Sequence, residues 1–139
     1  MRSADYAKVR RLWKSTKGIG LDECDARERV SRYLRRNPGL SFVAVEGKQI
    51  IGAALCGHDS GRRGYLHHLA VSREFRRRGI GSTLVSRCLG ALRKRGIGKC
   101  NAFLYGNNAA GGRFWRRRGW KVRDELRFIQ RKTLGRSPK

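Results

Sequence analysis

Apolar residues recur along this chain at two spacings, one typical of helices and the other typical of strands. The helical spacing predicts helices over residues 6–13, 22–36, 80–95 and 109–118. Runs rich in β-branched and aromatic residues predict strands over residues 41–46, 49–56, 65–71 and 99–105, with one or two more over 120–132. The resulting order, α-α-β-β-β-α-β-α-β-β, indicates a mixed α/β fold.

The clearest of these elements is the helix over residues 80–95. Its apolar positions form one stripe, made by Ile80, Leu84, Val85, Cys88, Leu89 and Leu92. Asp5 is predicted to cap the first helix, and Pro38 is predicted to stop the second. A tight turn at residues 47–48 joins two strands into a hairpin. These boundaries predict one domain over residues 1–134, followed by a short basic tail over 135–139.

Length and hydrophobicity restrict the class of protein. The 139 residues fit one domain, and a hydrophobic share of 39% is enough for a packed core. The sequence contains neither an apolar run long enough to span a membrane nor the apolar region of a signal peptide. We therefore expect a cytoplasmic protein with no membrane partner.

The net charge of +24 comes from 34 basic and 10 acidic residues. Such a field attracts polyanions, including nucleic acid and phosphorylated cofactors. The same arginines are equally compatible with ordinary solvated positions. Charge by itself therefore leaves both interpretations open.

The cysteines and histidines show no metal-binding pattern. Cys24, Cys56, Cys88 and Cys100 are far apart in sequence, which favours reduced thiols, and the last three are predicted to be small core residues. A site made by His58, His67 and His68 is disfavoured because adjacent residues of a strand point apart. We expect no metal.

A glycine-rich segment between a predicted strand and the long helix carries the strongest chemical signal. It reads Arg76, Arg77, Arg78, Gly79, Ile80, Gly81 and Ser82. Glycines let the backbone approach a ligand closely, and the free N–H groups at a helix start attract a pyrophosphate. Leu84 stands where a Rossmann loop needs its third glycine, and no lysine precedes Ser82 as in a Walker loop.

This segment resembles the motif of the GNAT acetyltransferase superfamily, Gln/Arg-x-x-Gly-x-Gly/Ala, at every defined position. The preceding residues 69–71 are similar to the family's fourth strand. Asn108, the pair at 114–115 and the pair at 119–120 are similar to the family pattern Asn-x-x-Ala-x-x-Leu-Tyr-x-x-x-Gly-Phe. The resemblance implies a mostly antiparallel central sheet flanked by helices, whose fourth and fifth strands, here 65–71 and 99–105, splay apart.

The same resemblance implies an N-acetyltransferase that moves the acetyl group of acetyl-CoA to a primary amine by direct attack in a ternary complex. The pantetheine arm would lie between the splayed strands, bonded by the backbone around Leu69, Ala70 and Val71. The N–H groups from Arg76 to Ser82 would hold the pyrophosphate, while the arginine side chains pair with phosphates or are solvated. Asn108 would contact the cofactor arm, and Trp115 would pack against that arm or in the core.

The proton-transfer groups differ from those usual in the family. Trp115 stands where the family often has a tyrosine that acts as general acid. The strand over 65–71 has no glutamate, although the family often has one there. His67 and His68 are candidate bases because histidine titrates near neutral pH. Strand alternation predicts that these two side chains lie on opposite faces of the sheet. Tyr105 is the candidate acid, and for all three a purely structural role is the alternative.

Residues 1–3 resemble the end of the family's first strand, so a truncated first strand is expected, with an exposed hairpin edge that favours a homodimer.

The rival functions are a basic nucleic-acid or ribosome-binding module and an acetyl-CoA-binding protein without catalysis. The amine acceptor is a small molecule or a protein amine. The basic surface disfavours strongly cationic acceptors, unless acidic residues gather at the cleft, namely Asp22, Glu23, Asp25 and Glu28.

Overall fold

The computed structural model describes residues 1–135. Its main elements are α1 (Tyr6–Lys14), α2 (Arg27–Arg36), β1 (Phe42–Glu46), β2 (Gln49–His58), β3 (Gly64–Val71), α3 (Ile80–Lys94), β4 (Cys100–Ala102) and α4 (Ala109–Arg117). Contacts divide the chain into two compact units, one over residues 1–105 and one that begins at Gly106. The single domain over 1–134 stays a prediction, and all of the predicted tail except Gly135 lies outside the described residues.

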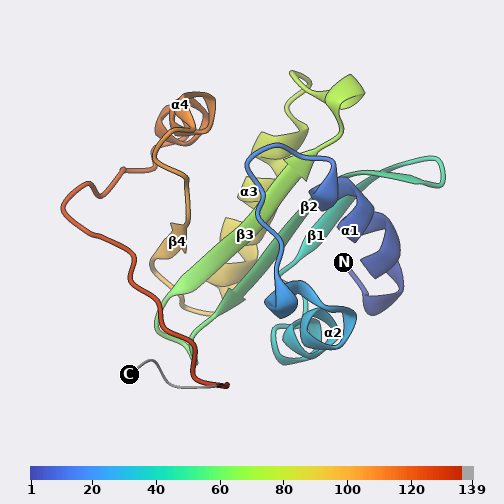
Figure 1. The fold of residues 1–139 in the computed structure, drawn as a ribbon. Helices are drawn as coiled ribbons and strands as arrows, with labels where there is room; N and C mark the ends of the chain where they lie inside the picture. The colour runs from blue at the N-terminus through green and yellow to red at the C-terminus, as the bar shows by residue number, and fades with distance from the viewer. Residues whose placement is uncertain (136–139) are drawn as a thin grey trace. The chain divides into compact units, whose positions relative to one another are not determined.

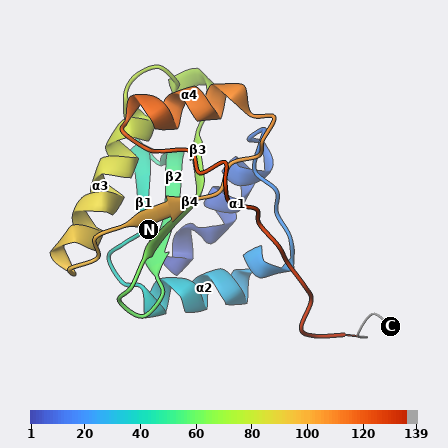
Figure 2. The ribbon, with the colours of Figure 1, turned by 90° about the vertical axis from the view of Figure 1, so that its left-hand side faces the viewer.

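The first unit is a four-stranded mixed sheet with helices on both faces (Figure 1). The strands follow the order β1-β2-β3-β4, in which β1–β2 and β2–β3 are antiparallel and β3–β4 is parallel. Helices α1 and α2 cover one face and α3 covers the other, as the turned view makes clear (Figure 2). The predicted fold class is therefore confirmed.

Side chains along β2 point alternately to the two faces of the sheet, so one strand packs against both helical layers. A side chain added at Gly52 would meet Leu84 and Ile80 of α3, whereas one added at Gly57 would meet Tyr33 of α2. The core under α1 and α2 is built from residues of both helices and of β2 and β3, namely Val9, Leu12, Trp13, Val30, Leu34, Ala53, Leu55 and Ala70. The stripe predicted on α3 is buried at Leu84, Val85, Cys88 and Leu92. Burial of this apolar area stabilises the sheet that carries the site.

Several predicted details need correction. The Asp5 side chain does not cap α1, because its carboxylate accepts a hydrogen bond from the Arg2 N–H in a preceding 3-10 turn. Residues 120–132 contain no strand, and the strand predicted over 99–105 is limited to Cys100–Ala102. No strand forms at residues 1–3, where the Met1 ammonium donates to the Ser41 carbonyl.

Cys56 and Cys88 are buried, as predicted, and Cys100 is half-buried. One outer strand of the sheet is β1, which pairs with β2 alone among the described residues. A homodimer through this edge stays a prediction. Within residues 1–135, no helix is long and apolar enough to cross a membrane.

Candidate active site

A β-bulge in β3 shapes the centre of the candidate site. Ala53 pairs with Ala70 and Leu55 pairs with His67, so Ala54 alone faces the two residues His68 and Leu69. At His68 the backbone has a φ of 52°, a left-handed conformation that side chains rarely adopt. The extra residue interrupts the strict alternation of the strand.

The bulge overturns the prediction that the two histidines lie on opposite faces. His67 contacts Tyr33 of α2, and His68 contacts Trp13 of α1, with ring centroids 6.3 and 4.9 Å apart. Both rings therefore lie under the layer of α1 and α2, and their own centroids are 6.3 Å apart. Two neighbouring residues share one face because the left-handed residue turns the strand between them.

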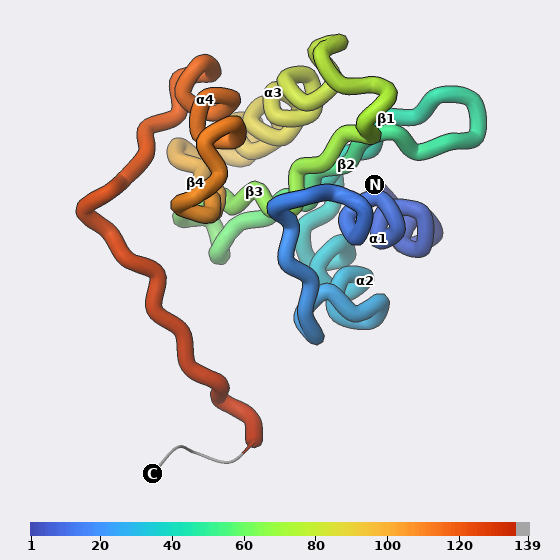
Figure 3. The backbone as a smooth tube through the Cα atoms, turned by 45° about the horizontal axis from the view of Figure 1, so that its top comes forward, coloured from blue at the N-terminus to red at the C-terminus, as the bar shows by residue number. Residues whose placement is uncertain are grey.

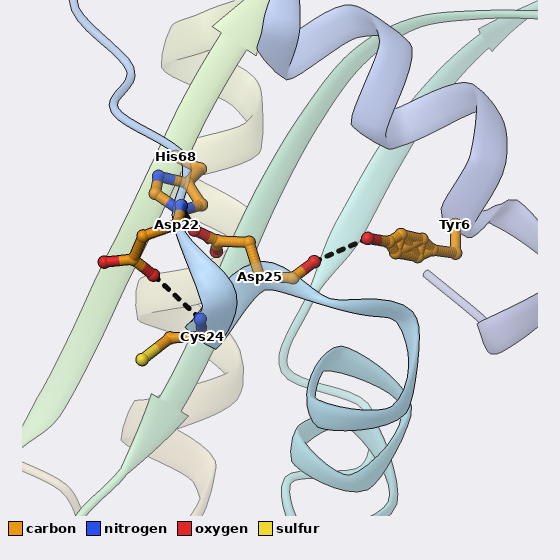
Figure 4. A network of polar contacts seen from close by, with 5 residues as sticks. All are labelled: Tyr6, Asp22, Cys24, Asp25 and His68. Carbon is orange, nitrogen blue, oxygen red and sulfur yellow. Dashed lines mark hydrogen bonds and ion pairs between the residues drawn. The ribbon is translucent and has the colours of Figure 1, made fainter. Parts of the chain in front are cut away.

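His68 is held by a buried carboxylate from outside the sheet (Figure 4). Its Nε2 lies 2.8 Å from Oδ1 of Asp25, in the 3-10 turn Glu23–Asp25 that precedes α2. The other oxygen of Asp25 accepts from the Asp22 N–H at 3.1 Å, and the Asp25 carbonyl accepts from the Tyr6 hydroxyl at 2.5 Å. The segment between α1 and α2 thus crosses β3 and is fastened to it at His68 (Figure 3).

His67 has a different environment, made of aromatic rings. The rings of Tyr65 and Phe103 stack on it with centroids 6.2 and 5.9 Å away. Within residues 1–135 its ring nitrogens have no hydrogen-bond partner. Burial lowers the pKa of His67, the neighbouring His68 lowers it further, and Asp25 opposes the shift. A histidine with a lowered pKa is neutral at pH 7 and is able to accept a proton.

Tyr105 ends the first unit beyond β4 and is 59% exposed. Its hydroxyl lies against Gly20, where an added Cβ would stand 2.6 Å from the oxygen. Gly20 belongs to the same segment between α1 and α2 that carries Asp25. This segment therefore contacts two of the three predicted proton-transfer residues.

One edge of β3 is open beyond its first three residues. Among the described residues, β4 pairs with β3 at Gly64, Tyr65 and Leu66, and the remainder of β3 has no partner on that side. The backbone of Leu69 and Val71 therefore borders the opening between the two strands. Ala70 is buried in the core below α1 and α2, so it offers the opening its backbone only.

The glycine-rich loop follows β3 after a 3-10 turn over Arg73–Phe75. Arg76 turns back and donates from Nε to the Val71 carbonyl at 2.9 Å, while the Arg78 guanidinium covers the Phe75 ring at 5.1 Å. Arg77 and Gly79 have φ angles of 64° and 79°, and an added Cβ at Gly79 would meet no atom within 4 Å. The loop thus offers an uncrowded helix start at Ile80, whose first N–H groups have no partner within the helix.

The sequence profile of the acetyltransferase (GNAT) family matches residues 6–120. The chain belongs to this family. An acetyltransferase of Pectobacterium atrosepticum is 35% identical over 109 residues, which cover 78% of this chain and 76% of that protein. N-alpha-acetyltransferase 30 of Schizosaccharomyces pombe is 32% identical over 105 residues, covering 69% and 70%.

A solved structure shares the fold of this GNAT chain. The PaiA N-acetyltransferase of Thermoplasma acidophilum, in complex with coenzyme A, superposes with a TM-score of 0.73 at 21% identity and covers 89% of this chain and 88% of its own. The GNAT chain is an acetyl-CoA-dependent N-acetyltransferase, with acetyl-CoA as its co-substrate. The open edge of β3 and the uncrowded Gly79 fit such a molecule, which supplies an activated acetyl thioester when bound.

The two remaining predicted cofactor residues lie in the second unit of the GNAT chain. The Asn108 side chain caps α4, because its Oδ1 accepts a hydrogen bond from the Gly111 N–H at 2.9 Å. Trp115 packs edge-on against Trp120, with centroids 4.6 Å apart, and against Phe114. Both contacts lie within the second unit, so the roles of Asn108 and Trp115 toward acetyl-CoA stay predictions.

Two surface hollows lie along the flank of α3 that faces β1. Their volumes are about 520 and 370 Å³, and Phe42 and Arg87 line both of them. Gly79 and Arg78 line the smaller hollow, and neither hollow is lined by a residue of β3 or β4. The opening between β3 and β4 stays the predicted place of the chemistry.

Sequence reasoning gave Asp25 no role at His68. The sequence offers one signal, the acidic group Asp22, Glu23, Asp25 and Glu28, which indicates a favoured helix start or an attraction for cationic acceptors. Of its four members, the structure brings the Asp25 carboxylate to His68, and Asp22 closes the 3-10 turn by accepting from the Cys24 N–H at 2.8 Å. Among residues 1–135, no group of three or more His, Cys, Asp or Glu side chains is arranged to hold a metal ion.

Proposed function

We propose that this acetyltransferase acetylates a primary amine by direct attack on bound acetyl-CoA, with His67 as the general base. The observation that carries the proposal is the setting of His67. It lies beside the bulge of β3, at the point where β4 stops pairing, and burial lowers its pKa. A neutral imidazole next to an open strand edge suits the removal of a proton from an ammonium group.

The proposed proton path uses two residues of the first unit. His67 takes a proton from the ammonium group, directly or through water, so that the nitrogen lone pair is free to attack. The C–N bond forms, and the C–S bond breaks as the Tyr105 hydroxyl gives a proton to the departing thiolate. The new amide nitrogen then releases its extra proton to the Tyr105 phenolate or to water. Holding both reactants in one cleft supplies a further large part of the acceleration.

The proposed acetyl-CoA contacts follow the backbone from β3 into α3. The backbone of Leu69 and Val71, at the open edge, forms hydrogen bonds with the amides of the pantetheine arm. The N–H groups from Arg76 to Ser82 hold the pyrophosphate, because a helix start carries partial positive charge. Arg76 contributes mainly through its backbone, since its side chain is engaged with Val71.

Calorimetric titration with acetyl-CoA tests these contacts. Gly79→Val combined with Gly81→Val should abolish micromolar binding, because valine resists the left-handed φ of 79° and crowds the phosphates. Gly98→Val is a suitable control, since an added Cβ there meets no atom within 4 Å. Intact binding in the double variant would contradict the proposed pyrophosphate site.

The base is tested by pH–rate profiles of His67→Ala and His68→Ala. We expect His67→Ala to lose the acidic limb of kcat/KM and about 10²-fold or more in rate, the usual share of a general base. His68→Ala should keep the limb, because its Nε2 is occupied by Asp25. Unchanged profiles in both variants would exclude the two histidines as bases.

An amine screen identifies the acceptor. The fission-yeast relative is named an N-alpha-acetyltransferase, which supports placing peptides with a free α-amino group first in the screen. Small amino compounds and lysine-containing peptides follow. Acetylated product, measured by mass spectrometry, assigns the acceptor, and transfer to none of these amines would contradict the proposed catalysis.

A second property, contact with polyanions, is supported by the ion pairs. Among the described residues, the arginines that pair with a carboxylate are Arg62, with Asp59, and Arg123, with Glu125. Most of the positive charge is therefore not neutralised within the chain. Retention on RNA that falls steeply with salt would support this contact, and indifference to RNA at low salt would refute it.

A further inference from the structure

Asp25 carries the one buried carboxylate among the described residues. The residue is 9% exposed, and its two oxygens accept from His68 Nε2 and the Asp22 N–H. Its own carbonyl accepts from the hydroxyl of Tyr6, a buried residue of α1. Asp25 therefore has one position relative to α1, to the 3-10 turn and to β3.

The partner of this carboxylate is the residue that forms the bulge. His68 has a φ of 52°, and such a conformation persists only where the surroundings hold it. Two contacts do so, since Asp25 binds Nε2 and Trp13 packs edge-on against the ring. A carboxylate only accepts, so the shared proton lies on Nε2 of His68 and the ring has one defined orientation.

The bulge in turn orients the two residues next to His68. His67 precedes it and Leu69 is its second residue, at the edge that β4 leaves open. If the bulge relaxed to regular pairing, every side chain on one side of it would change face, because strand alternation has a period of two. The position of the His67 ring and of the Leu69 backbone therefore depends on His68.

We propose that Asp25 is a positioning residue for acetyl transfer, which binds His68 and so holds the β3 bulge that presents His67 and the Leu69 backbone to the two substrates. This inference rests on the proposed function. It adds that the segment between α1 and α2 acts on the reaction through strand β3. Asp25 itself need touch neither substrate.

The first test is a double-mutant cycle on kcat/KM, with Asp25→Ala, His68→Asn and the double variant. Asparagine tolerates the left-handed conformation, so His68→Asn keeps the bulge while removing the partner of Asp25. We expect Asp25→Ala to lose about tenfold or more, as for a hydrogen bond to a charged group, and to cost little more in the His68→Asn background. Additive losses would overturn the link through His68.

The control is Glu23→Ala, an exposed acid of the same 3-10 turn, which should leave kcat/KM unchanged. Asp25→Glu, which retains the carboxylate, should recover part of the rate lost in Asp25→Ala. Thermal unfolding of each variant separates activity from folding. A lower Tm with unchanged kcat/KM in Asp25→Ala would reduce Asp25 to a stabilising residue and overturn the proposal.

The pH dependence of kcat/KM is a further test, because it would not change if Asp25 only stabilised the fold. His67 is faced by His68 and Tyr65 of β3, by Asp25 and by Tyr33 of α2. Because the Asp25 charge raises the pKa of His67 against the effect of burial, its loss should move the acidic limb of kcat/KM to lower pH. A limb that stays in place in Asp25→Ala would contradict the coupling.

Acetyl-CoA binding distinguishes this proposal from the proposed function. Calorimetry should show weaker acetyl-CoA binding in Asp25→Ala, by about threefold or more, and unchanged binding in His67→Ala, since only the first alters the strand edge. Wild-type binding in Asp25→Ala would overturn the positioning role even if catalysis by His67 holds. If His67→Ala kept the acidic limb of kcat/KM while Asp25→Ala still weakened acetyl-CoA binding, only the proposed base would be overturned.

Discussion

Gly20 offers a way to displace the Tyr105 hydroxyl without changing Tyr105 itself. An alanine Cβ at position 20 would stand 2.6 Å from that oxygen, whereas ordinary contact begins at 3.4 Å. The hydroxyl must therefore move by about 0.8 Å, the difference between the two distances. Both residues are exposed, so the ring is free to move and the chain should fold normally.

The size of the effect follows from the role proposed for Tyr105. A displacement of about 1 Å in a catalytic group costs up to about 10²-fold in rate. That loss corresponds to about 2.7 kcal/mol of transition-state stabilisation. We therefore expect Gly20→Ala to lower kcat by about tenfold to 10²-fold, with an unfolding free energy within about 0.5 kcal/mol of the wild type.

The assay is the release of coenzyme A thiol at saturating substrates, with thermal unfolding in parallel. Tyr105→Phe removes the hydroxyl and should match or exceed the loss in Gly20→Ala. Gly98→Ala serves as the control, because its added Cβ meets no atom within 4 Å. Wild-type kcat in both Gly20→Ala and Tyr105→Phe would refute Tyr105 as the acid.

Three further predictions concern stability and reactivity. Gly64→Ala places a Cβ 2.5 Å from Cδ1 of Leu92, which is 2% exposed, so chemical denaturation should show a loss of about 1–3 kcal/mol. Because the folded pKa of His67 lies below 6.5, its burial carries no penalty above pH 6.5 and a growing one as the pH falls toward the lowered value. The unfolding free energy of the wild type should thus decline more steeply below pH 6.5 than that of His67→Gln, and parallel curves would contradict the shift. The exposed Cys24 thiol has a raised pKa, chiefly because of Asp22, so Asp22→Asn should speed its alkylation by iodoacetamide at pH 8.

The sequence alone determined the elements whose signal is local. The stripe on α3, the proline at position 38 and the turn at 47–48 fixed most boundaries to within two residues. Local sequence was also enough to predict that the glycine-rich loop leads into a helix start, which has the same free N–H groups in any fold. The sheet strands β1 to β3 followed from composition in the same way.

Tertiary structure decided the matters that depend on contacts distant in sequence. The bulge at His68 cannot be predicted from alternation, because alternation assumes that each strand residue has one partner. The residue that holds it, Asp25, lies 43 positions away and was brought there by packing of the segment between α1 and α2. The strands predicted over residues 120–132 do not form, because a β-rich segment becomes a strand only when another strand supplies its hydrogen bonds. Pattern sets what a segment is able to form, and the partners that folding brings to it set what forms and where each reactive group points.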